Sequence, residues 1–223
     1  MIKNIMDNLE HVPPAVLKKV LSGCLWEGEP ESGVLSLTFD DGPDPQITPA
    51  VLDVLDEINA RGTFFLTGEN VRKHPDIARM IAERGHVTGN HSMTHRKMMM
   101  MKSADVISEI DDTQKAIADA AGIEPALFRP PYGIFDFTVS GAVKDRGLSM
   151  VLWTVLSGDY SDDSADTIME TVRPFIRPGA IQVFHDTTAG GNMALIEIIR
   201  QIGTIAGDKN IRLGTVNELT GSH

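Results

Sequence analysis

Short apolar runs recur along the chain. In the stretches between these runs, an apolar residue occurs at every third or fourth position. The runs are rich in β-branched and aromatic residues, which is typical of buried strands. Strands are predicted at residues 34–39, 63–67, 87–90, 126–128, 150–155, 180–184 and 211–213. The stretches between them have the spacing of amphipathic helices.

Proline, glycine and small polar residues mark the ends of these helices. Thr48 before Pro49 predicts one helix start, and Pro75 opens a second helix. Ser103 is expected to cap a third helix, which Gly122 ends. Further helices are predicted at about residues 139–144, 164–174 and 192–205.

The alternation of strands and helices predicts an α/β fold. Strands separated by helices imply parallel pairing through right-handed crossovers. Seven units fit an irregular, incompletely closed (β/α)7 barrel better than the regular eightfold form, and an open doubly wound sheet is the alternative. No linker or charge block divides the chain, so we expect a single domain of residues 34–219 with residues 1–33 packed on it as an N-terminal extension.

The composition narrows the class of protein without identifying a substrate. Hydrophobic residues make up 42% of the 223 positions, and the net charge of −11 argues against non-specific nucleic-acid binding. Cys24 is the single cysteine, so no intramolecular disulfide can form. No stretch reaches the ~20 apolar residues that span a bilayer, and no signal core opens the sequence, so we expect a cytoplasmic protein. The sequence leaves the oligomeric state open.

Polar residues follow directly on the ends of several predicted strands. Asp40 and Asp41 lie at the end of the first strand, and His91, Arg129 and His185 lie at the ends of later ones. In an α/β barrel these ends converge on one face, so residues distant in sequence become neighbours. Successive side chains of a strand point to opposite faces, so the two aspartates are expected to differ in task. One could bind a metal while the other stays free as a base.

The segment His91-Ser-Met-Thr-His95 places two imidazoles four residues apart. Both can reach one metal ion, and Asp41 is the natural third ligand. This spacing also occurs by chance, and it gains weight from the aspartate pair at the strand end. Ser92 is expected to hold the loop by a hydrogen bond from its side chain to the backbone.

The segment Arg129-Pro-Pro-Tyr-Gly133 combines two prolines, which fix the backbone, with a glycine, which permits an unusual turn. A segment this rigid could form one wall of an active site. It would hold Arg129 against a carboxylate and present a backbone N–H to a developing oxyanion. A structural turn with a surface arginine is the alternative.

Together these motifs resemble those of the polysaccharide deacetylase family, also called the NodB homology domain or carbohydrate esterase family 4. Thr38-Phe-Asp-Asp-Gly42 matches the first family motif, and the segments at residues 91–95 and 129–133 match the second and third. Val183-Phe-His185 resembles the last motif, in which leucine usually stands at the first of these positions. The resemblance covers about residues 34–219.

The resemblance implies a metal site flanked by a base and an acid. Asp41, His91 and His95 would bind a divalent metal, usually Zn²⁺, with Co²⁺, Ni²⁺ or Mn²⁺ as other candidates. Asp40 would be the general base and His185 the general acid.

Two further residues receive roles from the resemblance. Arg129 would orient the base, and the backbone N–H of Tyr132 would help to stabilise the oxyanion. The implied reaction removes N-acetyl groups from an acetylated amino sugar or a chitin-like or peptidoglycan-like polysaccharide and releases acetate. The same scaffold also serves O-deacetylases, sugar deformylases and hydrolases of small cyclic amides, so these stay as alternatives.

The fourth family motif, usually Asp-x-x-Asp-Trp, is incomplete in this chain. Leu156 stands where the first aspartate is expected, Asp159 keeps the second, and Tyr160 replaces the tryptophan. Asp159 is therefore the candidate that tunes His185. The missing acid is also the one feature that favours a catalytically silent carbohydrate-binding protein, and the retention of the other site residues argues against that reading.

Overall fold

A curled parallel sheet forms the centre of the protein. The computed structural model describes residues 11–161, 163–188 and 194–219. Within these residues the sheet has eight strands in the order β5-β4-β3-β2-β1-β7-β6, with β8 paired to β1, and every pair is parallel. The strands are β1 (Val34–Asp40), β2 (Thr63–Leu66), β3 (Val87–Asn90), β4 (Leu127–Phe128), β5 (Ser149–Met150), β6 (Val155–Leu156), β7 (Ile181–His185) and β8 (Arg212–Gly214).

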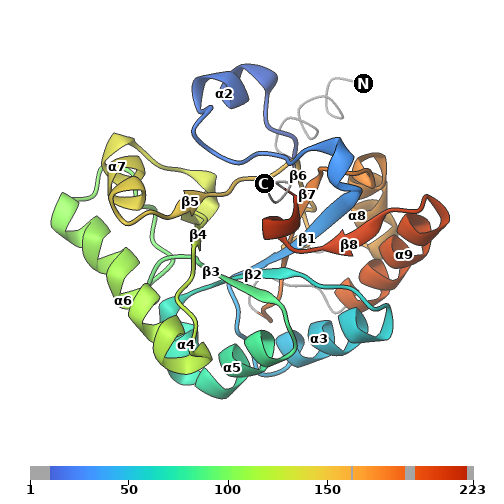
Figure 1. The fold of residues 1–223 in the computed structure, drawn as a ribbon, viewed down its shortest axis with the longest axis horizontal. Coiled ribbons are helices and arrows are strands. Elements are labelled where there is room, and N and C mark those ends of the chain that lie inside the picture. The colour runs from blue at the N-terminus through green and yellow to red at the C-terminus, as the bar shows by residue number, and fades with distance from the viewer. Residues whose placement is uncertain (1–10, 162, 189–193, 220–223) are drawn as a thin grey trace.

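Helices cover the outside of this sheet in an arc, and one short helix stands apart from it (Figure 1). The arc consists of α3 (Ile47–Glu57), α4 (Gly68–Lys73), α5 (Pro75–Glu83), α6 (Ser103–Ala121), α7 (Phe137–Asp145), α8 (Ala165–Val172) and α9 (Leu195–Asp208). The separate helix is α2 (Ala15–Val20). The irregular, incompletely closed barrel is confirmed. No helix among the described residues has both the length and the apolar character to cross a membrane.

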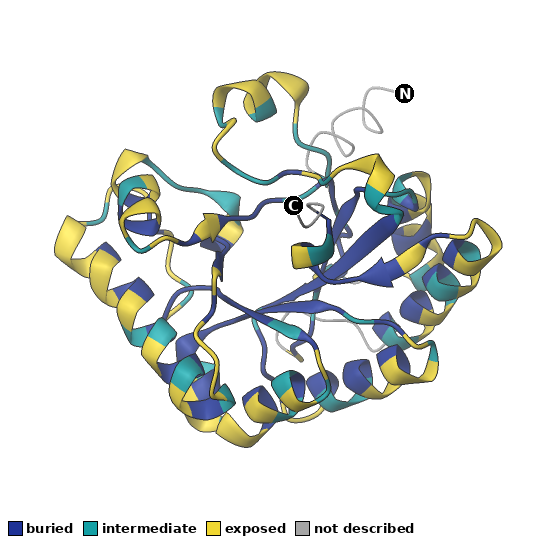
Figure 2. Ribbon diagram, viewed as in Figure 1, coloured by how far each residue is buried: buried dark blue, intermediate teal, exposed yellow. Residues whose placement is uncertain are grey.

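The strand β1 lies at the centre of the core, and all seven of its residues are buried. Its side chains alternate between the two faces of the sheet. Leu35, Leu37 and Phe39 belong to the apolar cluster that includes residues of α3 and α9. Thr38 and Asp40, on the opposite face, point into the barrel, where both contact one arginine. Figure 2 shows the same layering, with buried strands inside and helices exposed on their outer faces.

The strand predicted at residues 150–155 is two strands, and the prediction of one was wrong. The chain changes partner between them, because β5 pairs with β4 whereas β6 pairs with β7. At the break, Leu25 of the N-terminal segment bridges Val151. The backbone N–H of Leu25 donates to the carbonyl of Met150 at 2.8 Å, and that of Leu152 donates to the carbonyl of Leu25 at 2.8 Å. The N-terminal segment thus pairs with the sheet between β5 and β6, where the hydrogen-bond ladder of the sheet is interrupted. The domain division at residue 33 stays a prediction.

Other boundaries differ from the predictions in detail. The first helix of the arc begins at Ile47, so Thr48 lies inside it, and Ser103 is the first residue of α6 rather than its cap. Gly122 ends α6 in a left-handed conformation, as expected. The helix α4 was not predicted, because six residues are too few to show a period. The predicted start at residue 192 lies outside the described residues.

Truncation of a buried aromatic residue of β1 tests this core. Phe39 is fully buried, and its ring stacks on that of Phe64 with centroids 4.8 Å apart. We expect Phe39→Ala to lower the free energy of unfolding by about 3–5 kcal/mol in chemical denaturation, because the cavity cannot collapse fully. Phe137→Ala removes a side chain that is 96% exposed and should leave that free energy nearly unchanged. Similar effects of the two substitutions would contradict the described packing.

Candidate metal centre and active site

The two aspartates at the end of β1 separate because the backbone changes conformation between them. Asp40 is the last residue of the strand and points into the barrel, where it is 4% exposed. Asp41 has φ of 75°, in the left-handed region that non-glycine residues seldom adopt. This turn directs its carboxylate toward the two histidines of the loop after β3.

The carboxylate of Asp40 is held by a fully buried arginine. Arg129 Nη1 donates to Asp40 Oδ1 at 2.6 Å and to Thr38 Oγ1 at 2.8 Å. The same guanidinium donates to the carbonyls of Val151 and Leu152 at 3.3 and 3.1 Å. These bonds hold the guanidinium against Asp40, and the burial of Arg129 excludes the alternative of a surface arginine.

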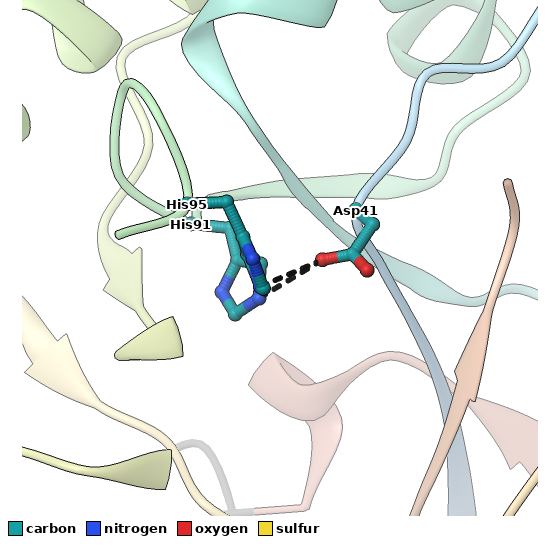
Figure 3. A group of neighbouring side chains, drawn as sticks. All are labelled: Asp41, His91 and His95. Carbon is teal, nitrogen blue, oxygen red and sulfur yellow. Dashed lines mark ion pairs between the residues drawn. The ribbon is translucent and has the colours of Figure 1, made fainter. Parts of the chain in front are cut away.

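Asp41, His91 and His95 converge at the mouth of the barrel (Figure 3). The Nε2 atoms of His91 and His95 lie 3.4 and 3.0 Å from Asp41 Oδ1. One possible ligand atom from each residue lies within 4.8 Å of the other two. Two imidazole nitrogens and one carboxylate oxygen are a donor set suited to zinc and similar divalent metals.

Three observations show that this group fits a cation. The side chain of Asp41 has a buried Oδ1 atom with no hydrogen-bond partner among the described residues. His91 Nδ1 lies 2.8 Å from the carbonyl oxygen of Arg129, so Nδ1 carries a proton, and Nε2 is the ring nitrogen that faces Asp41. Burial opposes ionisation of Asp41, but its contacts with His91 and His95 outweigh burial and hold its pKa well below the usual range.

The loop that carries the two histidines is braced by its own polar side chains. Ser92 and His95 both have left-handed backbone conformations, with φ of 66° and 55°. Ser92 Oγ accepts a hydrogen bond from the His95 backbone N–H at 3.1 Å, as predicted. Asn90 Oδ1 accepts a bond from the Ser92 backbone N–H at 2.9 Å. These bonds offset the cost of a strained loop and set the direction of the His95 ring.

A buried glutamate on α6, which the sequence reasoning missed, holds the same loop from outside. Glu109 is 4% exposed and accepts bonds from the backbone N–H and the hydroxyl of Thr94 at 2.8 and 2.7 Å. Arg96 Nη2 donates to it at 2.7 Å. The sequence could have indicated that Glu109 is buried, because this residue lies beside Ile110 on the apolar face of α6.

The acid candidate lies across the cavity, with its ring fixed by Asp159. His185 Nδ1 is 2.8 Å from Asp159 Oδ1, and the His185 backbone N–H donates to Asp159 Oδ2 at 2.8 Å. Ser157 Oγ also donates to Oδ1, at 2.8 Å. Burial lowers the pKa of His185, but the hydrogen bond and charge of Asp159, with the charges of Asp40 and Asp41, outweigh burial and raise that pKa to about 9.

The residues around the incomplete fourth motif form an apolar wall. Leu156, at the position of the missing acid, lines the cavity together with Trp153 and Tyr160. The Tyr160 ring meets the His185 ring edge-on, with centroids 5.6 Å apart. His11 Nδ1, from the N-terminal segment, donates to the Leu156 carbonyl at 2.8 Å. The missing acid is not needed to hold the ring of His185, because Asp159 makes that contact.

A second layer of carboxylates, Asp44 and Asp186, supports the loop after β1, and sequence reasoning missed Asp186. Asp186 is fully buried, and burial raises its pKa well above the usual range. Thr48 Oγ1 donates to its Oδ2 at 2.5 Å, and any Cβ at Gly42 would collide with this carboxyl group. Asp44 accepts bonds from the backbone N–H groups of Gln46 and Ile47. Thr48 and Asp44 therefore brace the loop that turns Asp41 toward the histidines.

All eight site residues predicted from the sequence meet around two adjoining cavities. The larger, of about 420 Å³, is lined by Asp40, Asp41, His91, His95, Tyr132, Gly133, Trp153, Leu156, Tyr160 and His185. The second, of about 380 Å³, has a more polar lining of Asp41, Thr67, Glu69, Asn70, Met93, Thr94, His95, Tyr132 and Thr187. Arg129 and Asp159 lie behind the first cavity, in contact with Asp40 and His185. The metal candidates thus stand between an aromatic cavity and a polar one.

Curated relatives carry the same kind of domain. A peptidoglycan-N-acetylglucosamine deacetylase of Bacillus cereus is 37% identical over 184 residues, which cover 80% of this chain and 66% of that protein. A chitooligosaccharide deacetylase of Rhizobium leguminosarum bv. trifolii is 38% identical over 150 residues, which cover 67% of this chain and 70% of that protein.

Solved structures share the whole fold. The peptidoglycan N-acetylglucosamine deacetylase Bc1960, in complex with an aromatic hydroxamate (an N-oxidanyl-benzamide), matches with a TM-score of 0.86 and 31% identity over 92% of this chain and 97% of that one. BA3943 from Bacillus anthracis, described as a pseudoenzyme of carbohydrate esterase family 4, matches with a TM-score of 0.80 and 27% identity over 87% of this chain and 67% of that one. The model of the polysaccharide deacetylase family matches residues 27–151. With this match, these relatives and the geometry of its site, the chain belongs to the polysaccharide deacetylase family, carbohydrate esterase family 4.

Proposed function

We propose that this chain removes N-acetyl groups from an amino sugar polymer of the peptidoglycan or chitin type and releases acetate. The observation that carries the proposal is a possible metal site of three residues with two further proton-transfer groups, Asp40 and His185, in the same cavity. A protein that only binds sugar has no use for that set. Two relatives are named as a peptidoglycan-N-acetylglucosamine deacetylase and a chitooligosaccharide deacetylase, and these names support the choice of substrate.

Asp41, His91 and His95 would hold the metal, and zinc is the ion we propose. A bound divalent metal supplies a Lewis acid for the carbonyl oxygen and lowers the pKa of a water molecule toward neutrality. The Arg129 carbonyl fixes the ring of His91 by accepting a hydrogen bond from its Nδ1–H. Glu109 and Ser92 fix the loop of His95, so the three ligand atoms are positioned before any ion binds.

Asp40 is the base in this proposal, because it lies beside the metal candidates but is held by another partner. Its Oδ2 is 3.8 Å from His91 Nε2, and its Oδ1 is bonded to Arg129. One carboxylate oxygen is thus anchored and the other faces the cavity, where it can accept a proton from the attacking water. The backbone of Tyr132, with φ of 60°, lies at the wall of both cavities, and its N–H is our candidate for an oxyanion contact.

His185 is the acid, and Asp159 keeps it protonated. Nδ1 is engaged with Asp159, so Nε2 is the nitrogen that can pass a proton to the leaving amine. A group with a pKa near 9 carries its proton at neutral pH, which is the state that an acid needs at the start of the reaction.

The shape of the cleft favours a polymer over a small molecule. The two cavities lie on either side of Asp41, His95 and Tyr132, which line both of them. A chain of sugars could therefore continue beyond the reacting unit, whereas a small cyclic amide would fill only one side.

Removing the base should separate metal binding from turnover. We expect Asp40→Asn to bind zinc at the wild-type stoichiometry and to lower kcat for acetate release from an N-acetylglucosamine oligosaccharide by ~10²–10⁴. Zinc content by elemental analysis and acetate release are the two measurements. Loss of zinc together with activity would mean that Asp40 is a ligand and that the roles of the two aspartates are reversed.

Removing a metal ligand should lower zinc binding itself, unlike removal of the base. His95→Ala should weaken zinc binding by more than the ~10–100-fold typical of groups outside the metal's ligand shell. Chelation of the wild-type protein should abolish acetate release, and added zinc should restore it. The control His74→Ala alters a histidine at the start of α5 and should retain wild-type zinc affinity. Full zinc occupancy in His95→Ala would place the metal elsewhere.

The pH profile tests the link between Asp159 and His185. The folded-state pKa of His185 is raised to about 9 from its ordinary 6.5, so its contribution to stability is complete below pH 6.5 and is lost as the pH rises through 9. The alkaline limb of kcat/KM should lie near that upper value in the wild type. In Asp159→Asn the limb should move down by at least ~1 pH unit, because burial remains while the compensating charge is gone. Asp166→Asn, which changes an exposed carboxylate on α8, should leave the limb in place. An unmoved limb in Asp159→Asn would assign the proton to another group.

A further inference from the structure

The proposed acid depends on a stretch of chain with little regular structure. We call residues 151–160 the wall segment, and its one strand is β6, which is two residues long. Three of its side chains line the larger cavity, namely Trp153, Leu156 and Tyr160. The wall segment also carries Asp159, which bonds to His185. The placement of the His185 ring therefore depends on how firmly this segment is held.

The N-terminal segment contacts the beginning of the wall segment. Residues 11–26 precede the region that the family model matches. Leu25 of this segment bridges Val151. Thr154 Oγ1 donates a hydrogen bond to the carbonyl of Trp26 at 3.2 Å. The first half of the wall segment is thus fixed by residues outside the matched region.

His11 contacts the wall segment directly before Asp159. Its Nδ1 atom donates to the carbonyl of Leu156 at 2.8 Å. The imidazole also covers Gly158, because a Cβ at that glycine would lie 2.6 Å from His11 Cε1. Gly158 has φ of 81°, in the left-handed region that favours glycine. His11 thus contacts the chain on both sides of Ser157.

This contact lies at the open edge of the sheet. The strand β6 is the last in the sheet order, so its outer edge has no neighbouring strand among the described residues. On the inner side, the Ser157 backbone N–H donates to the carbonyl of Val183 in β7 at 3.0 Å. Val12, next to His11, packs against the apolar cluster that includes residues of β1. The turn before Asp159 is therefore held between β7 and an anchored histidine.

A displacement of this turn would reach the proposed acid directly. Asp159 Oδ1 lies 2.8 Å from His185 Nδ1, and Oδ2 accepts a bond from the His185 backbone N–H at 2.8 Å. Both bonds belong to one carboxylate, so a shift of its backbone changes them together. Hydrogen bonds weaken as their distance and angle depart from the preferred values. The support of the ring is therefore sensitive to small movements of the turn.

We propose that His11 is a positioning residue, which holds the turn before Asp159 through its bond to the Leu156 carbonyl and thereby sets the ring of His185. This inference rests on the proposed function, in which His185 is the acid. It makes the N-terminal segment a part of the construction of the active site. His11 acts through Asp159 and leaves the proton transfers to Asp40 and His185.

The test compares His11→Ala with His11→Asn, whose side-chain amide can still donate to the Leu156 carbonyl. His11→Ala should lower kcat for acetate release from an N-acetylglucosamine oligosaccharide by about threefold to tenfold, the usual worth of one hydrogen bond, with KM nearly unchanged. His11→Asn should recover most of that loss. His74→Ala, which alters a histidine at the start of α5, is the matched control and should keep wild-type kcat.

The ring of His185 gives a second readout that does not require turnover. In an NMR titration, the pKa of His185, raised to about 9 in the wild type, should fall by at least ~0.5 pH unit in His11→Ala. The reason is that the contact with Asp159 weakens while burial remains. The charges of Asp40 and Asp41 also face His185, and the substitution leaves them in place. His11→Asn should titrate like the wild type.

An unchanged titration of His185 in His11→Ala would overturn the proposal, and so would equal losses of kcat in His11→Ala and His11→Asn. If the wild-type protein releases no acetate from any oligosaccharide, the proposed function fails by itself, and the titration still tests the role of His11. Chemical denaturation of each variant establishes that the protein is folded under the assay conditions. If His11→Ala is unfolded, His11→Phe takes its place, because it keeps a ring over Gly158 and removes the donor.

Discussion

The site depends on one guanidinium group placed inside the barrel. Arg129 is fully buried, and burial of a charge is expensive unless hydrogen bonds and a counter-charge compensate for it. Here Asp40 supplies the charge, while Thr38 and the carbonyls of Val151 and Leu152 accept the remaining bonds. Loss of either charged partner would leave an unpaired buried ion, at a cost of about 3–5 kcal/mol. The contact between Arg129 and Asp40 therefore supports the core of the barrel and also fixes the carboxylate that we propose as the base.

Arg129 also connects Asp40 to the metal candidates. The carbonyl of Arg129 orients the ring of His91, and the side chain of Arg129 orients Asp40. Its guanidinium also bonds to the backbone at the break between β5 and β6, where the ladder is interrupted and the chain changes partner. The guanidinium of Arg129 is thus fixed inside the barrel, next to the break between β5 and β6. One left-handed residue conformation directs the carboxylate of Asp41 toward His91 and His95.

Sequence reasoning could locate the strands because each is a buried apolar run, and could locate the site because polar residues follow those runs directly. It failed at residues 150–155, where strand-favouring residues follow one another without a break but the hydrogen-bond partners change. No local pattern carries that information, since it depends on Leu25 and Arg129 arriving from elsewhere. It also missed Glu109 and Asp186, which touch the site from behind. Glu109 could have been found as a charge on an apolar helix face, whereas the burial of Asp186 follows only from the packing of Thr48 and Gly42 against it.

In the proposed mechanism Asp41 binds the metal while Asp40 remains free to act as a base. A crystal structure of the zinc-loaded protein, with anomalous diffraction measured at the zinc edge, would distinguish the two aspartates. We expect one ion about 2.0–2.2 Å from Asp41, His91 and His95, with both oxygens of Asp40 beyond bonding distance and Arg129 still bonded to Asp40. An ion coordinated by Asp40, or one bound away from the two histidines, would contradict it.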